Sequence, residues 1–203
     1  ADGAAEDVTA RAVAALGGLH GLVNAAGILE SGTHETTTAA DWDRTMNVNL
    51  RAPFLLARAA LPHLKAATPA GAIVNVSSVS GLRPFPGVLA YCVSKAAVDQ
   101  LTRCLAIELA PTGVRVNAVN RGVVVTELHR RGGMAEAAYA AFLERGKTTH
   151  PLGRVGQPDE IARAIVFLLD GAQSGWITGE TLAIDGDRKS TRLNSSHSSV
   201  SRM

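Results

Sequence analysis

Hydrophobic and polar positions follow two alternating patterns along this chain. Short, mainly apolar segments, of the length expected for buried parallel strands, occur at residues 22–23, 72–76, 114–119 and 181–184. Segments with apolar residues at helical spacing or with helical composition occur at residues 7–16, 38–64, 90–110 and 159–170. Strands that alternate with helices predict an α/β fold, a doubly wound parallel sheet in three αβα layers with right-handed crossovers.

Residues that start or interrupt helices refine these elements. Thr38 or Asp41 is expected to cap the second helix, which Pro53 and Pro62 should interrupt. Between the third helix and the last one, residues 126–149 combine a Gly-Gly pair with a short amphipathic segment. This stretch predicts a lid over the carboxyl ends of the strands.

Length and composition predict one domain. The chain has 203 residues, 46% of them hydrophobic, which is enough for one sizeable core over residues 1–187. The formal net charge of +2 includes four basic residues and no acidic residue within 188–203, so the remainder carries −2. Aromatic residues make up 4% of the chain. We therefore expect no nucleic-acid partner.

The two cysteines favour a reducing compartment. Cys92 and Cys104 fall on one predicted helix, about 18 Å apart, and cannot pair with each other. No apolar run reaches 18 residues, so we expect a cytoplasmic protein without a membrane partner. The His, Cys, Asp and Glu residues show no metal-ligand spacing, so no metal is expected.

One group of residues carries candidate chemistry. Tyr91 and Lys95 are four positions apart on a predicted helix, so they share a face, and Ser78 lies thirteen residues upstream at a strand end. A neighbouring ammonium favours the phenolate form of a tyrosine, which makes the pair suited to proton transfer. The alternative is a half-buried aromatic residue, a solvated lysine and a serine that caps a helix.

These residues and their surroundings resemble the short-chain dehydrogenase/reductase family over about residues 8–186. The matching segments, in family order, are residues 24–27, 47–50, 74–78, 91–95, 114–117, 151–154, 158–162, 178–180 and 184–186. The resemblance implies a Rossmann-like fold. It also implies an NAD(P)-dependent oxidoreductase that transfers a hydride between a nicotinamide cofactor and an alcohol or carbonyl substrate.

The resemblance also assigns roles to four residues. Tyr91 would be the general acid/base, and Lys95 would favour its phenolate and bind the nicotinamide ribose. Ser78 would hold the substrate oxygen, and Asn49 would fix a water that links Lys95 to solvent. Cofactor contacts, with NAD or NADP, are implied for Asn24, Gly27, Tyr91, Lys95, Gly122, Val124 and Thr126. Asn24 and Gly27 are equally expected of any tight turn between a strand and a helix.

The chain departs from the family pattern in two places. The family usually has proline where Arg121 stands, and arginine should loosen that turn and add charge beside the nicotinamide. No Gly-x-x-x-Gly-x-Gly turn, the family's phosphate-binding element, precedes Asn24. The first βαβαβ segment is therefore expected to be missing. We expect the strand at residues 22–23 to be a bare, aggregation-prone edge and this fragment to be inactive alone.

The sequence supports four further expectations. Residues 188–203 resemble translated vector sequence and are expected to be non-native or disordered. When full length, family members usually form dimers or tetramers, and the candidate contact residues are Leu101, Leu105 and Ile107. A solvated lid face, rather than a site for an anionic substrate, is expected for His129, Arg130, Arg131 and His150. The competing function is a non-catalytic Rossmann-like binding module.

Overall fold

The structure is a computed structural model that describes residues 3–190. Its four strands are β1 (Gly21–Asn24), β2 (Ala72–Ser78), β3 (Arg115–Arg121) and β4 (Thr181–Ile184). The longer helices are α1 (Ala4–Leu16), α2 (Ala39–Met46), α3 (Ala52–Ala66), α5 (Leu89–Leu109), α7 (Glu136–Thr149) and α8 (Pro158–Leu169). One-turn helices are α4 (Val79–Leu82), α6 (Leu128–Arg131) and α9 (Gly171–Ser174). A π-helical turn covers Asn47–Arg51, and 3-10 turns cover Ala110–Thr112 and Arg188–Ser190.

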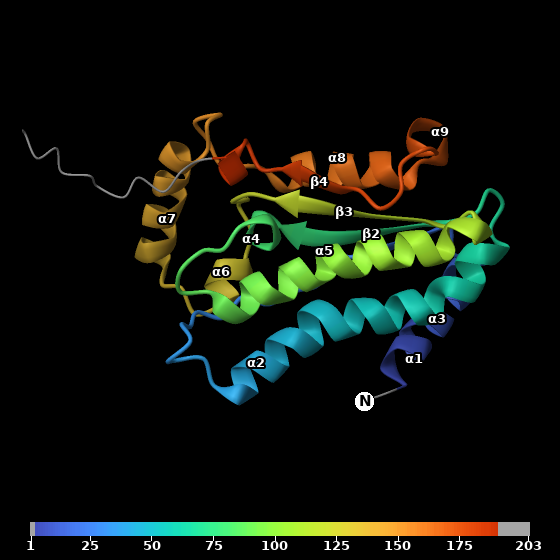
Figure 1. The fold of residues 1–203 in the computed structure, drawn as a ribbon, viewed down its shortest axis with the longest axis horizontal. Helices are drawn as coiled ribbons and strands as arrows, with labels where there is room; N and C mark the ends of the chain where they lie inside the picture. The colour runs from blue at the N-terminus through green and yellow to red at the C-terminus, as the bar shows by residue number, and fades with distance from the viewer. Residues whose placement is uncertain (1–2, 191–203) are drawn as a thin grey trace, which may run out of the picture.

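The strands form one parallel sheet in the order β1-β2-β3-β4. Helices α3 and α5 lie on one side of the sheet and α8 lies on the other, as Figure 1 shows. The predicted α/β fold with a parallel sheet and flanking helices is therefore confirmed. Strand β1 forms one edge of this sheet, and its Val23 is 39% exposed. The predicted tendency of this edge to aggregate stays a prediction.

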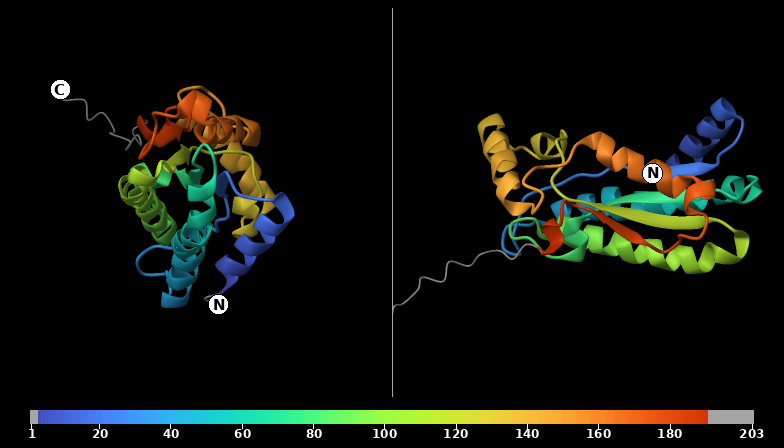
Figure 2. Two further views of the ribbon diagram at one scale, coloured as in Figure 1. Left: turned by 90° about the vertical axis from the view of Figure 1, so that its right-hand side faces the viewer. Right: turned by 90° about the horizontal axis from the view of Figure 1, so that it is seen from above.

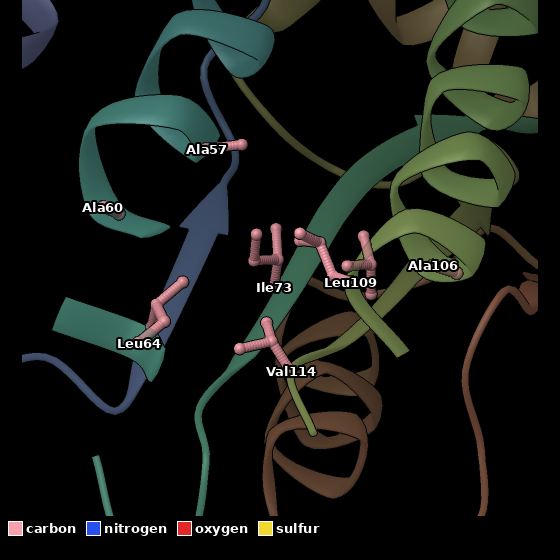
Figure 3. Packing of buried hydrophobic residues seen from close by; sticks show 8 residues of the cluster. Ala57, Ala60, Leu64, Ile73, Ala106, Leu109 and Val114 are labelled. Atoms are coloured by element: carbon pink, nitrogen blue, oxygen red, sulfur yellow. The ribbon is translucent and has the colours of Figure 1, made fainter. Parts of the chain in front are cut away.

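Alternating residues of β2 build two hydrophobic cores. Ile73 faces α3 and α5, where it packs with Leu64 and Leu109, and Figure 3 shows these side chains meeting between the helices. Its neighbour Val74 points to the opposite face, where it packs with Leu168 of α8. Both β2 side chains are fully buried, so this strand is the centre of the fold.

Helices α2 and α3 are continuous through the π-helical turn. Thr38 is the N-cap, because its hydroxyl accepts from the amide of Asp41. The expectation that Pro53 and Pro62 interrupt this helix is wrong. Pro53 lies in the first turn of α3, directly after the π-helical turn, whose wider register is closed by the bond from Ala52 N to Asn47 O. Pro62 removes one hydrogen bond from a helix that is anchored in the core by buried residues on either side of it.

The predicted lid is a packed substructure at the carboxyl ends of the strands, and Figures 1 and 2 show α7 beyond that end of the sheet. The Tyr139 side chain is 1% exposed, and its hydroxyl donates to Thr126 O and accepts from Thr126 N. Arg130 stacks on the Tyr139 ring and pairs with Glu127 and Glu136. These contacts attach α6 and α7 to the segment that follows β3.

Two lid histidines contradict the expected solvated face. His129 and His150 are 9% and 3% exposed. The Nδ1 of His150 lies 2.6 Å from Gly146 O and therefore carries the proton, whereas its Nε2 accepts from Val123 N at 3.1 Å. His150 thus bridges α7 and the end of β3 as a neutral ring. Burial lowers the pKa of His150, and burial lowers that of His129 to about 4.

The expected non-native tail begins at Arg188, and only its first three residues are described. The Arg188 side chain donates to the hydroxyl of Thr149 at 2.7 Å and stacks over the Phe85 ring. The rest of the predicted tail lies outside the described residues.

The β2 core generates a first prediction. Replacing Ile73 by alanine removes buried methyl groups and leaves a cavity, so we expect the free energy of unfolding to fall by about 2–5 kcal/mol. Urea denaturation followed by circular dichroism would measure it. The control is Ile107→Ala, at a side chain that is 77% exposed, which should change stability by less than about 0.5 kcal/mol. Equal effects of the two substitutions would contradict this core assignment.

The bridging histidine generates a second prediction. Because the folded-state pKa of His150 is lowered, its contribution is fully present above about pH 6.5. We expect that contribution to be lost as pH falls below 6.5 through the folded-state pKa, since protonated Nε2 would face the amide of Val123. His150→Gln should therefore flatten the dependence of unfolding free energy on pH, measured by urea denaturation.

The exposed His34 offers the matched control for this substitution. His34→Gln should change the free energy of unfolding at pH 7.5 by less than about 0.5 kcal/mol. If His150→Gln shows the same slope between pH 7.5 and 4.5 as the parent, the bridge does not depend on a neutral ring.

Candidate functional site

A pocket of about 820 Å³ opens at the carboxyl ends of the strands, the edge where open α/β sheets bind ligands. Its wall includes residues 25–30 after β1, Val76 of β2, and Tyr91 and Lys95 of α5. The segment after β3, the lid helix α6 and one face of α8 complete it. The volume lies within the range of small-molecule sites.

Lys95 is fixed at the bottom of this wall. Its ammonium donates to Val76 O at 2.8 Å and lies 5.7 Å from the centre of the Tyr91 ring. Tyr91 and Lys95 are 3% and 5% exposed, so the alternative with a solvated lysine and a half-buried tyrosine is wrong. Burial lowers the pKa of Lys95, the nearby Tyr91 opposes this shift, and the charge of Arg121 adds to it.

Asn49 lies in the π-helical turn and is 1% exposed. Its amide oxygen accepts from Ile28 N at 2.8 Å, and its amide nitrogen donates to Ile28 O and to the hydroxyl of Ser94. Ser94 donates in turn to Tyr91 O at 2.8 Å. A Cβ on Gly27 would lie 3.4 Å from Asn49 Oδ1 and 3.6 Å from Lys95 Nζ. Asn49 therefore ties the loop after β1 to the helix that carries Tyr91.

Ser78 ends β2 and also caps α4, so the cap alternative is realised in the structure. Its hydroxyl oxygen accepts from Ser80 N at 3.1 Å in the first turn of this short helix. As an acceptor in this bond, the hydroxyl keeps its proton available for another oxygen. Ser78 is not on the pocket wall, and Ser77 turns toward α5, where it donates to Lys95 O at 3.3 Å.

Two of the expected cofactor contacts lie away from the pocket. The Asn24 side chain donates to Asn75 Oδ1 at 2.8 Å and braces β1 against β2. A Cβ on Gly122 would lie 2.9 Å from His150 Nε2 and 3.0 Å from Asp185 O, so close packing requires glycine there.

Arg121 does not loosen the chain, contrary to expectation. Strand β3 continues through Arg121, which is paired in register with Ser78 and with Ile184. Its side chain instead lines the pocket.

The other expected cofactor contacts do line the pocket. Gly27, Val124 and Thr126 are on its wall, together with Tyr91 and Lys95. Within the described part of the chain, the buried Thr126 hydroxyl has no hydrogen-bond partner. A buried hydroxyl without a partner costs free energy, which a ligand with a polar group at this position would recover.

The sequence analysis missed a buried polar pair behind the site. The Asn120 amide donates to Asp99 Oδ2 at 2.8 Å and to Ser78 O at 3.1 Å, which fixes the end of β2. Burial raises the pKa of Asp99. A sequence signal existed, because Asp99 lies four residues after Lys95 on the same helix face, where an unpaired carboxylate would be costly.

Residues 3–190 contain neither a cluster of metal-binding side chains nor a helix that could span a membrane. No three His, Cys, Asp or Glu side chains gather there in a way that could hold a metal ion. No helix in that range combines the length and the apolar character needed to cross a bilayer.

The comparisons with known proteins agree with this geometry. Residues 1–186 match the family model described as Enoyl-(Acyl carrier protein) reductase. The chain is 40% identical over 185 residues to 2-(S)-hydroxypropyl-CoM dehydrogenase 3 of Xanthobacter autotrophicus, an alignment that covers 90% of this chain and 72% of the relative. It is 41% identical over 172 residues to Inactive 2-(S)-hydroxypropyl-CoM dehydrogenase 2 of the same organism, covering 85% of this chain and 74% of the relative.

A solved structure shows the same similarity in three dimensions. The gluconate 5-dehydrogenase of Burkholderia cenocepacia, in complex with NADP and tartrate, superposes with a TM-score of 0.84 at 30% identity. The match covers 95% of this chain and 73% of that one. The fold, the pocket at the strand ends and these matches lead to one conclusion: the chain belongs to the short-chain dehydrogenase/reductase family of oxidoreductases.

Proposed function

We propose that Tyr91 is the general acid/base of an NAD(P)-dependent oxidoreductase that interconverts an alcohol and a carbonyl compound. The observation that carries this proposal is the position of the buried Lys95 ammonium, 5.7 Å from the centre of the Tyr91 ring on the pocket wall. A tyrosine hydroxyl on a pocket wall can exchange a proton with a substrate oxygen, and a nearby cation stabilises negative charge that develops there during the reaction. Relatives with this family's chemistry include the dehydrogenases named above.

Each neighbouring residue supports the proton transfer. Ser78 keeps a hydroxyl proton that can be donated to the substrate oxygen, and Asn120 fixes the strand end on which Ser78 lies. Asn49 holds the backbone of Ile28 and, through Ser94, the backbone of Tyr91. We propose that Asn49 also fixes a water that links Lys95 to solvent.

The pocket fits a nicotinamide cofactor, NAD or NADP. When bound, the cofactor donates or accepts the hydride. The Thr126 hydroxyl, buried on the wall without a partner among the described residues, suits the amide of the nicotinamide. Gly27 and Val124 also line the pocket, and Lys95 would hold the ribose. The proposal keeps Asn24 and Gly122 beside the cofactor. The Asn24 side chain is bonded to Asn75, and His150 and Asp185 fill the space beside Gly122.

We also propose that residues 1–203 alone do not turn over substrate. The chain spans about two thirds to three quarters of the length of the first relatives, from 65% to 74%. No glycine-rich phosphate turn precedes residue 24, and such a turn provides the amide groups that bind the cofactor's pyrophosphate. Catalysis is therefore assigned to a protein with that segment.

Assembly into homodimers or homotetramers is proposed for the same full-length protein. Ile107 is 77% exposed on the outer face of α5, and Val93 on the same helix is 39% exposed. Leu105, also a candidate, packs partly against the core beneath α5.

A second function, a non-catalytic Rossmann-like module, has one observation in its favour. One relative at 41% identity has the name of an inactive dehydrogenase. Such a module would bind the cofactor without converting it. The presence of the buried Tyr91 and Lys95 pair on the pocket wall favours the enzyme.

The proton-transfer proposal generates the third prediction. In a chain completed with the glycine-rich segment of a relative, Tyr91→Phe should lower kcat by about 10²–10⁴-fold, because it removes the acid/base hydroxyl. The dissociation constant of the reduced cofactor, measured by its fluorescence, should change by less than about threefold. Turnover is read from the absorbance of the reduced cofactor with a panel of alcohols and ketones.

Two results would refute the proposal. Undiminished turnover by the Tyr91→Phe variant would exclude Tyr91 as the acid/base. Cofactor binding by the completed parent chain without turnover of any alcohol or ketone in the panel would favour the non-catalytic module.

A further inference from the structure

Two arginines, Arg121 and Arg131, line the same pocket. Arg121 ends β3 and Arg131 ends α6, and both line the pocket that contains Tyr91 and Lys95. The Arg121 guanidinium donates to Gly122 O at 3.3 Å. Within residues 3–190, neither arginine has a carboxylate partner. The pocket therefore contains two guanidinium groups whose charges are not neutralised by an ion pair.

The acidic residues on the wall do not neutralise these charges. Glu30 accepts from Arg44 at 2.6 Å, and Glu127 accepts from Arg130 at 2.8 Å. Neither Arg44 nor Arg130 is on the pocket wall. Each carboxylate is thus already paired with an arginine outside the pocket, while Arg121 and the exposed Arg131 line it.

The positive field of Arg121 reaches the centre of the site. After burial, its charge is a further cause that lowers the pKa of Lys95 and of His129. A bound anion near Arg121 would relieve this repulsion. Guanidinium groups bind carboxylates, sulfonates and phosphates through paired, charge-assisted hydrogen bonds.

The opposite wall of the pocket is apolar. Ile161 and Ile165 of α8 line it together with Ala162 between them. A ligand that suits both walls has a hydrocarbon part for α8 and an anionic group for the arginines. The hydroxyl or carbonyl group of such a ligand would lie beside Tyr91.

We propose that Arg121 and Arg131 determine substrate specificity by binding the anionic group of a hydroxy- or oxo-substrate, such as a carboxylate or sulfonate. The inference rests on the proposed function, because the bound alcohol or ketone is the substrate of that reaction. Arg131 is exposed, as expected of a solvated lid face, and the proposal gives this exposed charge a ligand. Guanidinium groups would also bind the phosphates of the cofactor, so the experiment tests a substrate anion and a phosphate anion separately.

The test is a binding titration of the 203-residue chain, monitored by NMR chemical shifts, with 3-hydroxybutyrate and its methyl ester. We expect the carboxylate to bind at least about tenfold more tightly than the neutral ester, since a charge-assisted hydrogen bond contributes about that factor. Arg121→Gln and Arg131→Gln should each remove most of this preference and leave ester binding unchanged. Arg121→Lys, which keeps the charge, should retain part of it.

Arg11 provides the matched control, because its side chain is 80% exposed on α1. Arg11→Gln removes the same charge and should leave the preference unchanged. Thermal unfolding of every variant checks that the fold is retained.

Three results would overturn the proposal. The first is equal binding of the carboxylate and the ester, and the second is a preference for the carboxylate that Arg121→Gln leaves intact. The third is that 3-hydroxybutyrate does not bind while inorganic pyrophosphate binds in a way that depends on Arg121. The last result would assign the anion site to the cofactor. The titration involves no hydride transfer, so its failure is distinct from a failure of the Tyr91 prediction.

Discussion

The hydrogen bond between the Lys95 ammonium and Val76 O is the interaction on which the site depends. It places a cation inside the protein, at the carboxyl end of the central strand, and burial there lowers the pKa of Lys95. A buried ammonium is costly unless its donors are satisfied, so the carbonyl of Val76 fixes where the charge lies. Lys95 also lines the pocket beside Tyr91, and an ammonium has two further N–H donors that a ligand could use.

Two sets of hydrogen bonds keep this arrangement in place. On one side, Asn49 joins the loop after β1 to Ser94 and through it to Tyr91. On the other, Asn120 and Asp99 fix the end of β2 beside Ser78. The pocket lies between them, and the lid is attached to it by Tyr139 and His150. The pocket, the candidate catalytic residues and the lid therefore belong to neighbouring segments at a single sheet edge.

Much of the fold could be predicted from the chain alone, because the strands are short apolar runs and the helices have clear spacing. Strand β4 is found where its pattern predicts it, whereas the effect of Pro53 and Pro62 was misjudged because the π-helical turn has no sequence signal. In the site, the four-residue spacing placed Tyr91 and Lys95 together. The burial of the two lid histidines could not be predicted, because polarity does not encode the contacts that cause it. His129 packs against the rings of Tyr139 and Phe142, and His150 bonds to the chain after β3.

The burial of Lys95 is best tested by NMR titration of the chain labelled with ¹⁵N-lysine, with Lys95→Gln to assign its signal. The account predicts that the Lys95 ammonium titrates below the usual value of 10.5, because burial and the charge of Arg121 both disfavour the protonated form. A midpoint at or above 10.5 would mean that Lys95 is solvated, and would contradict the site described here.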